Sequence, residues 1–228
     1  MNRTLSVMRM QFVNKYTFVW LPLIILGASL ALSVLIFAMI PYDGGKYGGG
    51  SQAPIWYFFA LGITSLSYTF PFSQALSLTR REFFFGTMLA AGVTALILAV
   101  AFVLGGAIEV ATGGWGVNGY FFYLDWVWQS GWLVAGLFFG ILSLMLFVIG
   151  FWGATLYRRF GALGLTLTLV AFGVVLVIAM FLVQQLDAWG TVFEWFAALG
   201  AGGLALGMAG ATVVFGVVAW ATLRRATP

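Results

Sequence analysis

The sequence predicts an all-α polytopic membrane protein with six transmembrane helices. Hydrophobic residues make up 63% of the chain, charged residues make up 7%, and the mean hydropathy is +1.07. So little polar surface cannot cover a water-soluble globule of 228 residues. The apolar stretches are continuous and do not alternate with polar residues, which excludes the short strands of a membrane barrel.

Six apolar runs have the length of roughly 20 residues that a helix needs to cross about 30 Å of hydrocarbon. The first run is too long for the hydrophobic region of a cleaved signal peptide, so it is interpreted as a span. The whole chain, 1–228, is expected to form a single transmembrane domain. Its predicted spans cover residues 16–40, 54–76, 83–108, 132–156, 160–183 and 196–223.

The charged residues fall into two groups that alternate along the chain. Nine of the ten basic residues precede the first span, follow the sixth, or separate the second span from the third and the fourth from the fifth. Five of the six acidic residues lie in the other connections. Lys and Arg are enriched in cytoplasmic segments, so both termini are expected in the cytoplasm. Residues 109–131 and 184–195 are then outer connections.

A short stretch of charge separates the second and third predicted spans. Pro71 is expected to kink or end the second span, because proline cannot donate to the helical ladder and clashes with the preceding turn. Residues 72–82 would then form a short helix at the cytoplasmic surface. Its mixed-charge tip suits the docking of a soluble partner, and the alternative is a simple positive-inside anchor. The tip residues are Ser77, Thr79, Arg80, Arg81 and Glu82.

No acid, base or histidine lies in the middle of a predicted span. Such residues are typical of proton relays and ion pathways, so a self-powered ion-coupled carrier is disfavoured. The chain has no histidine and no cysteine, which excludes His-ligated haem, thiolate chemistry and His-based metal sites. The hydroxyl groups have no general base within reach, so no catalytic residue and no metal ligand is assigned.

Small residues recur at four-residue spacing in two predicted spans, a pattern typical of close helix packing. They are Gly136 and Gly140 in the fourth span, and Gly203, Gly207 and Ala211 in the sixth. These positions would pack either within the chain or between two copies of it.

The order of polar residues, Thr-Arg-Arg-acid, aromatics and glycine over residues 73–87 resembles the small permease subunits of bacterial ABC-2-type ABC transporters. The number of spans and the position of the termini fit the same family. In that family the connection after the second span contacts the ATPase. The resemblance therefore implies that Ser77, Thr79, Arg80, Arg81 and Glu82 contact a separate ABC ATPase subunit.

The resemblance also implies a function: an exporter of a hydrophobic or amphipathic compound in the bacterial plasma membrane, acting as a pair of identical permeases. The chain contains no Gly-x-x-x-x-Gly-Lys-Ser/Thr motif, so ATP and Mg²⁺ would bind the partner ATPase and this chain would carry no cofactor. Family members also have an amphipathic helix on the inner leaflet, expected here over 1–15. A short helical element between the fifth and sixth spans is expected over 186–200.

Two other functions remain open on sequence grounds. The aromatic-rich segment 113–132 would suit a membrane substrate-binding subunit of an energy-coupling importer. A non-transport membrane assembly protein is the other alternative. The net charge of +4 reflects membrane topology, and no basic groove with interleaved aromatics indicates nucleic-acid binding.

Overall fold

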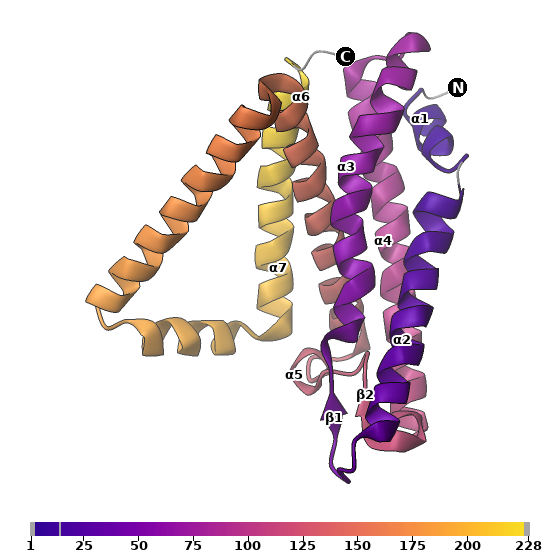
Figure 1. Cartoon of the computed structure of the whole chain (residues 1–228), viewed down its shortest axis with the longest axis vertical. Helices are drawn as coiled ribbons and strands as arrows, with labels where there is room; N and C mark the ends of the chain where they lie inside the picture. Colours follow the sequence, from indigo (N-terminus) through magenta and orange to yellow (C-terminus); the bar gives the residue numbers. More distant parts are fainter. Residues whose placement is uncertain (1–2, 14, 226–228) are drawn as a thin grey trace.

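The computed structural model describes residues 3–13 and 15–225 and is almost entirely helical (Figure 1). Residues 1, 2 and 14 of the expected 1–15 helix lie outside the described residues. The α-helices are α1 (Arg3–Gln11), α2 (Leu21–Met39), α3 (Gln52–Ala75), α4 (Arg80–Ala111), α5 (Asp125–Trp128), α6 (Trp132–Gln185) and α7 (Trp189–Leu223). The predicted all-α class is confirmed.

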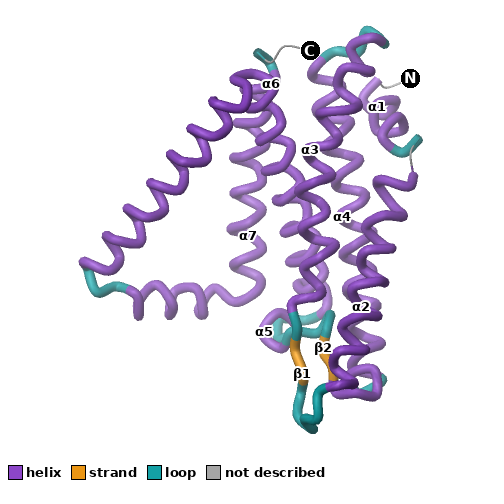
Figure 2. Tube along the Cα trace, viewed as in Figure 1, coloured by secondary structure: helices purple, strands orange, loops and turns teal. Residues whose placement is uncertain are grey.

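The remaining regular elements are short (Figure 2). A π-helical turn, Tyr16–Trp20, leads directly into α2, and a 3-10 turn, Gly49–Ser51, leads into α3. A tight turn, Gly114–Asn118, precedes the second of two strands of two residues each. The strands β1 (Lys46–Tyr47) and β2 (Gly119–Tyr120) pair in parallel, with Lys46 opposite Gly119 and Tyr47 opposite Tyr120.

Four helical segments are long and apolar enough to cross a membrane. They are Tyr16–Met39, Arg80–Ala111, Trp132–Gln185 and Trp189–Leu223. The helix α3 is not among them because its serine, threonine and tyrosine side chains lower its mean hydropathy. These four helices support the membrane class that the composition predicts.

Glycines divide each of the two longest helices into two parts. Gly161 of α6 has φ 72° and ψ −173°, and Gly200 of α7 has φ 58° and ψ −172°. Positive φ is accessible to glycine at little cost, so each glycine permits a sharp bend in the chain. The second arm of α6, residues 162–185, runs away from the bundle, and residues 201–223 return beside the first arm (Figure 1).

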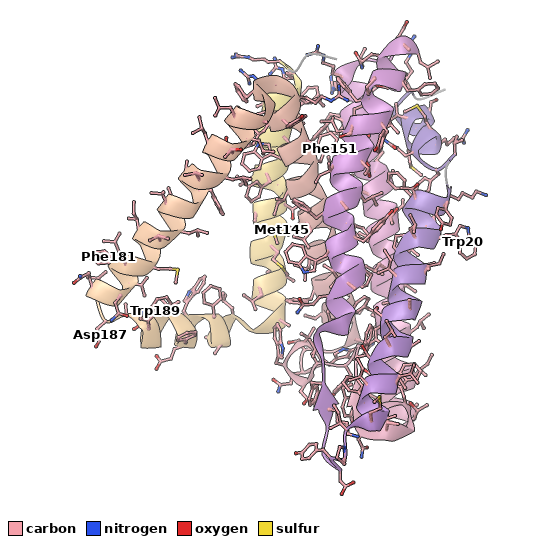
Figure 3. The ribbon with its side chains drawn as sticks, in the orientation of Figure 1. Trp20, Met145, Phe151, Phe181, Asp187 and Trp189 are labelled. Carbon is pink, nitrogen blue, oxygen red and sulfur yellow. The ribbon has the colours of Figure 1, made fainter. Side chains whose placement is uncertain are left out.

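The connection between these arms is itself helical. Residues 189–199 form a helix that lies across the end of the second arm of α6, and Asp187 and Trp189 mark the corner (Figure 3). The expected short helix over 186–200 is therefore present, whereas the connection 184–195 is less of a loop than the sequence suggested. The straight part of α7 begins at Ala201, a few residues after the predicted start of the sixth span.

The buried core lies where α3, α4 and the first arm of α6 meet. Large aromatic side chains fill it, and the rings of Phe70 and Phe83 meet edge to face with centroids 5.2 Å apart. Phe151 of α6, which is labelled in Figure 3, also packs against Phe83, with ring centroids 6.4 Å apart. By contrast, no residue from 161 to 200 is buried. The second arm of α6 therefore exposes apolar side chains around its circumference.

Two glycines set the distance between α3 and α6. A Cβ atom on Gly62 would overlap the backbone of Phe147, and a Cβ atom on Gly150 would overlap the backbone of Phe59. Each helix thus places a glycine against the backbone of the other, which is how helices approach most closely in membranes. Neither glycine belongs to the predicted packing pattern.

The small residues predicted to pack have different surroundings. A Cβ on Gly136 would lie 2.9 Å from the Val103 side chain of α4, and one on Gly140 would lie 3.2 Å from Ala99. These two positions therefore pack within the chain. In α7, Gly203 faces Leu199 of its own helix, Gly207 has open space, and Ala211 is partly exposed.

The crossing of α3 and α6 generates the first prediction. Gly62→Ala and Gly150→Ala are each expected to lower the free energy of unfolding by about 1–3 kcal/mol, because the added methyl group meets backbone that cannot rotate away. Thermal unfolding of the purified chain in detergent measures the effect. The matched control is Gly207→Ala, whose methyl group enters open space. Equal stability of Gly62→Ala and Gly207→Ala would contradict the assigned crossing point.

Candidate functional site

The charged turn between α3 and α4, residues 76–82, differs from the expected short helix. Pro71 lies inside α3, which continues to Ala75, and α4 begins at Arg80. The prediction of a separate helix over 72–82 is therefore wrong. The turn itself is tight, since Ser77 has a φ of 57° and the Leu78 amide donates back to the Ser73 carbonyl at 3.1 Å.

Thr79 and Glu82 form a capping box at the start of α4. The Glu82 amide donates to Thr79 Oγ1 at 3.2 Å, and the Thr79 amide donates to Glu82 Oε2 at 2.8 Å. Two amide groups that have no partner within the helix are satisfied in this way. The Thr-Arg-Arg-Glu order thus has a local structural reason, independent of any partner protein.

Arg80 connects the turn to the other end of the sequence. Its Nη1 donates to the carbonyl of Leu223 at 3.3 Å and to that of Arg224 at 2.6 Å. The last carbonyls of a helix have no helical donor, and the helix dipole makes them negative, so a guanidinium is well suited to cap them. Arg80 therefore fixes the end of α7 against the start of α4.

The helix α1 packs beside the same turn. Arg3 Nε lies 4.0 Å from Glu82 Oε1, and Val7 packs onto Gly86, where a larger residue would overlap it. Gln11 is buried, and its Nε2 donates to Thr69 Oγ1 at 3.1 Å and to Thr87 Oγ1 at 2.9 Å. Through these contacts α1 is held against both α3 and α4.

The five predicted partner-contact residues therefore divide into two groups. Thr79, Arg80 and Glu82 are engaged in bonds that hold α1, α4 and α7 together. Ser77 and Arg81 are exposed, and the Arg81 guanidinium lies 5.9 Å from the ring centroid of Phe85. Thr79 is exposed as well, but among the five only Ser77 and Arg81 have side chains with no hydrogen bond or ion pair to another described residue.

Arg158 explains why Pro71 does not break α3. Proline has no amide hydrogen, so Pro71 leaves the Ser67 carbonyl, four residues earlier, without its helical donor. The Nη2 of Arg158 in α6 donates to that carbonyl at 2.9 Å. An unpaired carbonyl in apolar surroundings is costly, and the arginine removes that cost. Arg158 thus has a structural role in addition to the topology signal predicted from its charge.

Glu109 organises the opposite end of the molecule. Its carboxylate is fully buried at the end of α4, where Oε1 accepts from the Trp115 indole at 2.6 Å and from the Phe121 amide at 2.7 Å. Oε2 accepts from the amides of Phe122 at 2.8 Å and Tyr123 at 2.7 Å. Four donors surround one carboxylate, so the segment that follows α4 folds back over the bundle. From the sequence, position 109 was expected only to be the acidic first residue of the connection 109–131.

Further contacts join the two connections at this end. The Tyr47 hydroxyl donates to Asp125 Oδ2 at 3.1 Å, and the Tyr47 and Tyr120 rings stack with centroids 5.3 Å apart. Desolvation raises the pKa of the Tyr47 hydroxyl above its usual range, and the bond to Asp125 raises it further. The hydroxyl therefore remains a protonated donor at neutral pH. The connections form an ordered cap, which comprises residues 41–51 and 112–131 and is called the outer cap after its predicted side of the membrane.

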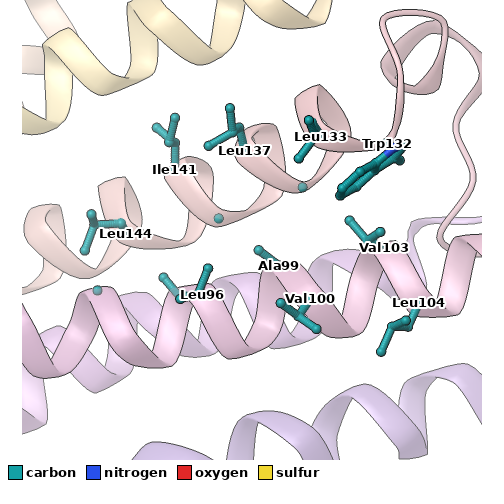
Figure 4. A pocket seen from close by; sticks show the side chains of 14 residues that line it. Leu96, Ala99, Val100, Val103, Leu104, Trp132, Leu133, Leu137, Ile141 and Leu144 are labelled. Carbon is teal, nitrogen blue, oxygen red and sulfur yellow. The ribbon is translucent and has the colours of Figure 1, made fainter.

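An apolar groove runs between α4 and the first arm of α6. Its volume is about 450 Å³, and it is lined by aliphatic side chains, glycines and the ring of Trp132 (Figure 4). Leu96, Val100 and Leu137 are half-exposed along it. The groove can hold alkyl or aromatic groups, and its lining offers no charge to an ionic ligand.

Within residues 3–13 and 15–225, no group of three His, Cys, Asp or Glu residues could hold a metal ion. Comparison with family models, curated proteins and solved structures returned no significant match to this chain. A function must therefore be inferred from the residues and their geometry.

A prediction follows for the outer cap. Glu109→Gln replaces one acceptor oxygen with an amide that faces two N–H donors, so the free energy of unfolding is expected to fall by about 1–3 kcal/mol. Thermal unfolding of the purified chain in detergent measures the loss. Glu194→Gln, at an exposed position, is the matched control. If both variants were equally stable, Glu109 would not organise the cap.

The pairing of Arg158 with the Ser67 carbonyl is tested by a double-mutant cycle. Arg158→Leu is expected to destabilise the wild type more than it destabilises Pro71→Ala, because alanine at position 71 restores an amide donor to that carbonyl. The expected coupling is about 1 kcal/mol, measured by thermal unfolding of the four proteins. Other contacts of Arg158 cancel in the cycle. Additive effects of the two substitutions would contradict the proposed compensation.

Proposed function

We propose that the chain crosses the membrane six times, with both termini in the cytoplasm. The two arms of α6 on either side of Gly161 would be separate spans, and α3 would be the second span. Arg80, Arg158 and the C-terminal arginines lie at the end of the molecule that carries the termini (Figure 1). Positive charge favours the cytoplasmic side, which supports this orientation.

We further propose that the chain is the permease subunit of an ATP-driven transporter of the ABC-2 type. One observation carries this proposal: the charged turn 76–82 is bonded to α1 through Glu82 and to α7 through Arg80. A partner that pushed on this turn would act on α1, α3, α4 and α7 together. Such a coupling point is what a permease requires, because its energy comes from a separate ATPase chain.

The apolar groove supports the substrate class. Its aliphatic lining between α4 and α6 suits a hydrophobic or amphipathic compound better than an ion. Its half-exposed walls would face lipid in the proposed orientation, so such a compound could enter from the bilayer. Export from the plasma membrane by two copies of the chain is the activity that we propose.

A membrane substrate-binding subunit is the second candidate, and the outer cap is the feature that favours it. The aromatic residues of segment 113–132 are, however, used largely for packing. Phe121 and Phe122 are buried, and the Trp128 indole donates to the Phe122 carbonyl at 3.2 Å. Because these aromatic side chains are used for packing, they give little support to a substrate-binding subunit. The charged turn supports the permease proposal more strongly.

The docking prediction concerns the exposed arginine of the turn. Arg81→Glu is expected to reduce co-purification of the ATPase at least roughly tenfold, because it reverses a charge at the proposed contact without removing a bond within the chain. Intact-complex mass measurement in mild detergent gives the composition, with two permeases and two ATPases expected in the wild type.

Lys15→Glu is the control, since Lys15 is an exposed base on the same predicted side and away from the turn. A wild-type chain that carries no nucleotide-binding partner would contradict the transporter proposal. Equal loss of the ATPase in both variants would show that general charge, and not the turn, governs the association.

A further inference from the structure

A cavity of about 530 Å³ lies where α7 ends and α6 bends. Its lining includes Arg159 from α6, Val217 and Val218 from α7, and Arg224 and Arg225 from the turn that follows α7. Three arginine residues therefore line one cavity, and no acidic residue is among its lining residues. Because three positive charges lie close together, the cavity favours an anionic ligand.

The arginines that border the cavity differ from those that stabilise the fold. Arg158 points to the Ser67 carbonyl, and Arg80 caps α7 from outside the cavity. The guanidinium of Arg159 lies 4.6 Å from the ring centroid of Phe160, a cation–π distance. The backbone of Arg224 is held by Arg80, so the position of the turn that carries Arg224 and Arg225 is fixed independently of their side chains.

The cavity also has an apolar side that identifies the class of anion. Val217 and Val218 lie about two helical turns before the arginines, roughly 10 Å along the axis. Val217 is 62% exposed and Val218 is 38% exposed, so an alkyl chain can approach them from the side. In the proposed orientation, the arginines lie at the headgroup level and the valines lie deeper in the hydrocarbon.

We propose that this cavity binds the headgroup of an anionic phospholipid from the cytoplasmic leaflet. A guanidinium group can donate two parallel hydrogen bonds to the oxygens of one phosphate. Basic pockets between membrane helices are therefore suited to anionic headgroups. The acyl chains run along Val217 and Val218. The lipid contacts both the bend of α6 and the end of α7, two elements that a hydrogen bond between Thr155 and Thr222, at 2.7 Å, already joins. The site is independent of any role in transport.

The test compares lipid retention by the full chain in mild detergent. Wild-type protein receives equal amounts of phosphatidylglycerol and phosphatidylcholine, and intact mass counts the bound lipids. Phosphatidylglycerol is expected to be retained preferentially. Arg159→Gln/Arg224→Gln/Arg225→Gln is expected to lose this preference at least roughly tenfold. The bonds from Arg80 go to backbone carbonyls, so the triple variant keeps them.

The matched control is Arg9→Gln/Lys15→Gln/Arg81→Gln, which removes the same charge from exposed positions elsewhere at this end. It is expected to retain phosphatidylglycerol as the wild type does. Equal retention by the two triple variants would overturn the site. In a last experiment, inorganic phosphate is added to the complex with phosphatidylglycerol. Complete displacement of the lipid by millimolar phosphate would overturn the lipid assignment and indicate a site for a soluble phosphate.

Discussion

The structure depends on one constraint: backbone polar groups inside an apolar medium must be paired. Each unpaired amide or carbonyl costs several kcal/mol where water is absent. Hydrogen bonds within helices satisfy most of these groups. Charged side chains lie where a backbone group has no partner within its own helix. Arg158 supplies a donor to the carbonyl that Pro71 leaves free, Arg80 caps α7, and Glu109 accepts three backbone amides beyond the end of α4.

This use of charge has a mechanical consequence for the proposed function. Contacts of the same charged side chains also join distant segments, since the turn 76–82 is held to α1 by the Arg3–Glu82 ion pair and to α7 by the hydrogen bonds of Arg80. The outer cap is fixed in a similar way by Glu109. The second arm of α6 and the helix that follows it contain no buried residue, in contrast to these two ends.

The fold class was predictable because the bilayer alone requires an apolar composition and apolar runs of roughly 20 residues. The break between the fourth and fifth predicted spans followed from the basic residues that separate them. The course of α3 was not predictable. Pro71 is normally a helix breaker, and the donor that compensates for it comes from Arg158, 91 positions away from the carbonyl it serves. Glu109 was missed for the same reason, since its three amide partners are brought together only by the fold. Among the predicted tip residues, Thr79 and Glu82 have the three-residue spacing of a capping box, which is visible in the sequence. Nothing in the local sequence indicates that Arg80 bonds to the end of α7.

The central proposal is that Gly161 divides α6 into two spans that would meet on the cytoplasmic side. The chain has no cysteine, so a single introduced cysteine reports on one position. Phe160 and Leu186 are both exposed, one beside the bend and one at the far end of the second arm. With a membrane-impermeant maleimide on intact cells, Leu186→Cys is expected to be labelled at once and Phe160→Cys only after permeabilisation. Labelling of both positions from the same side would contradict the account.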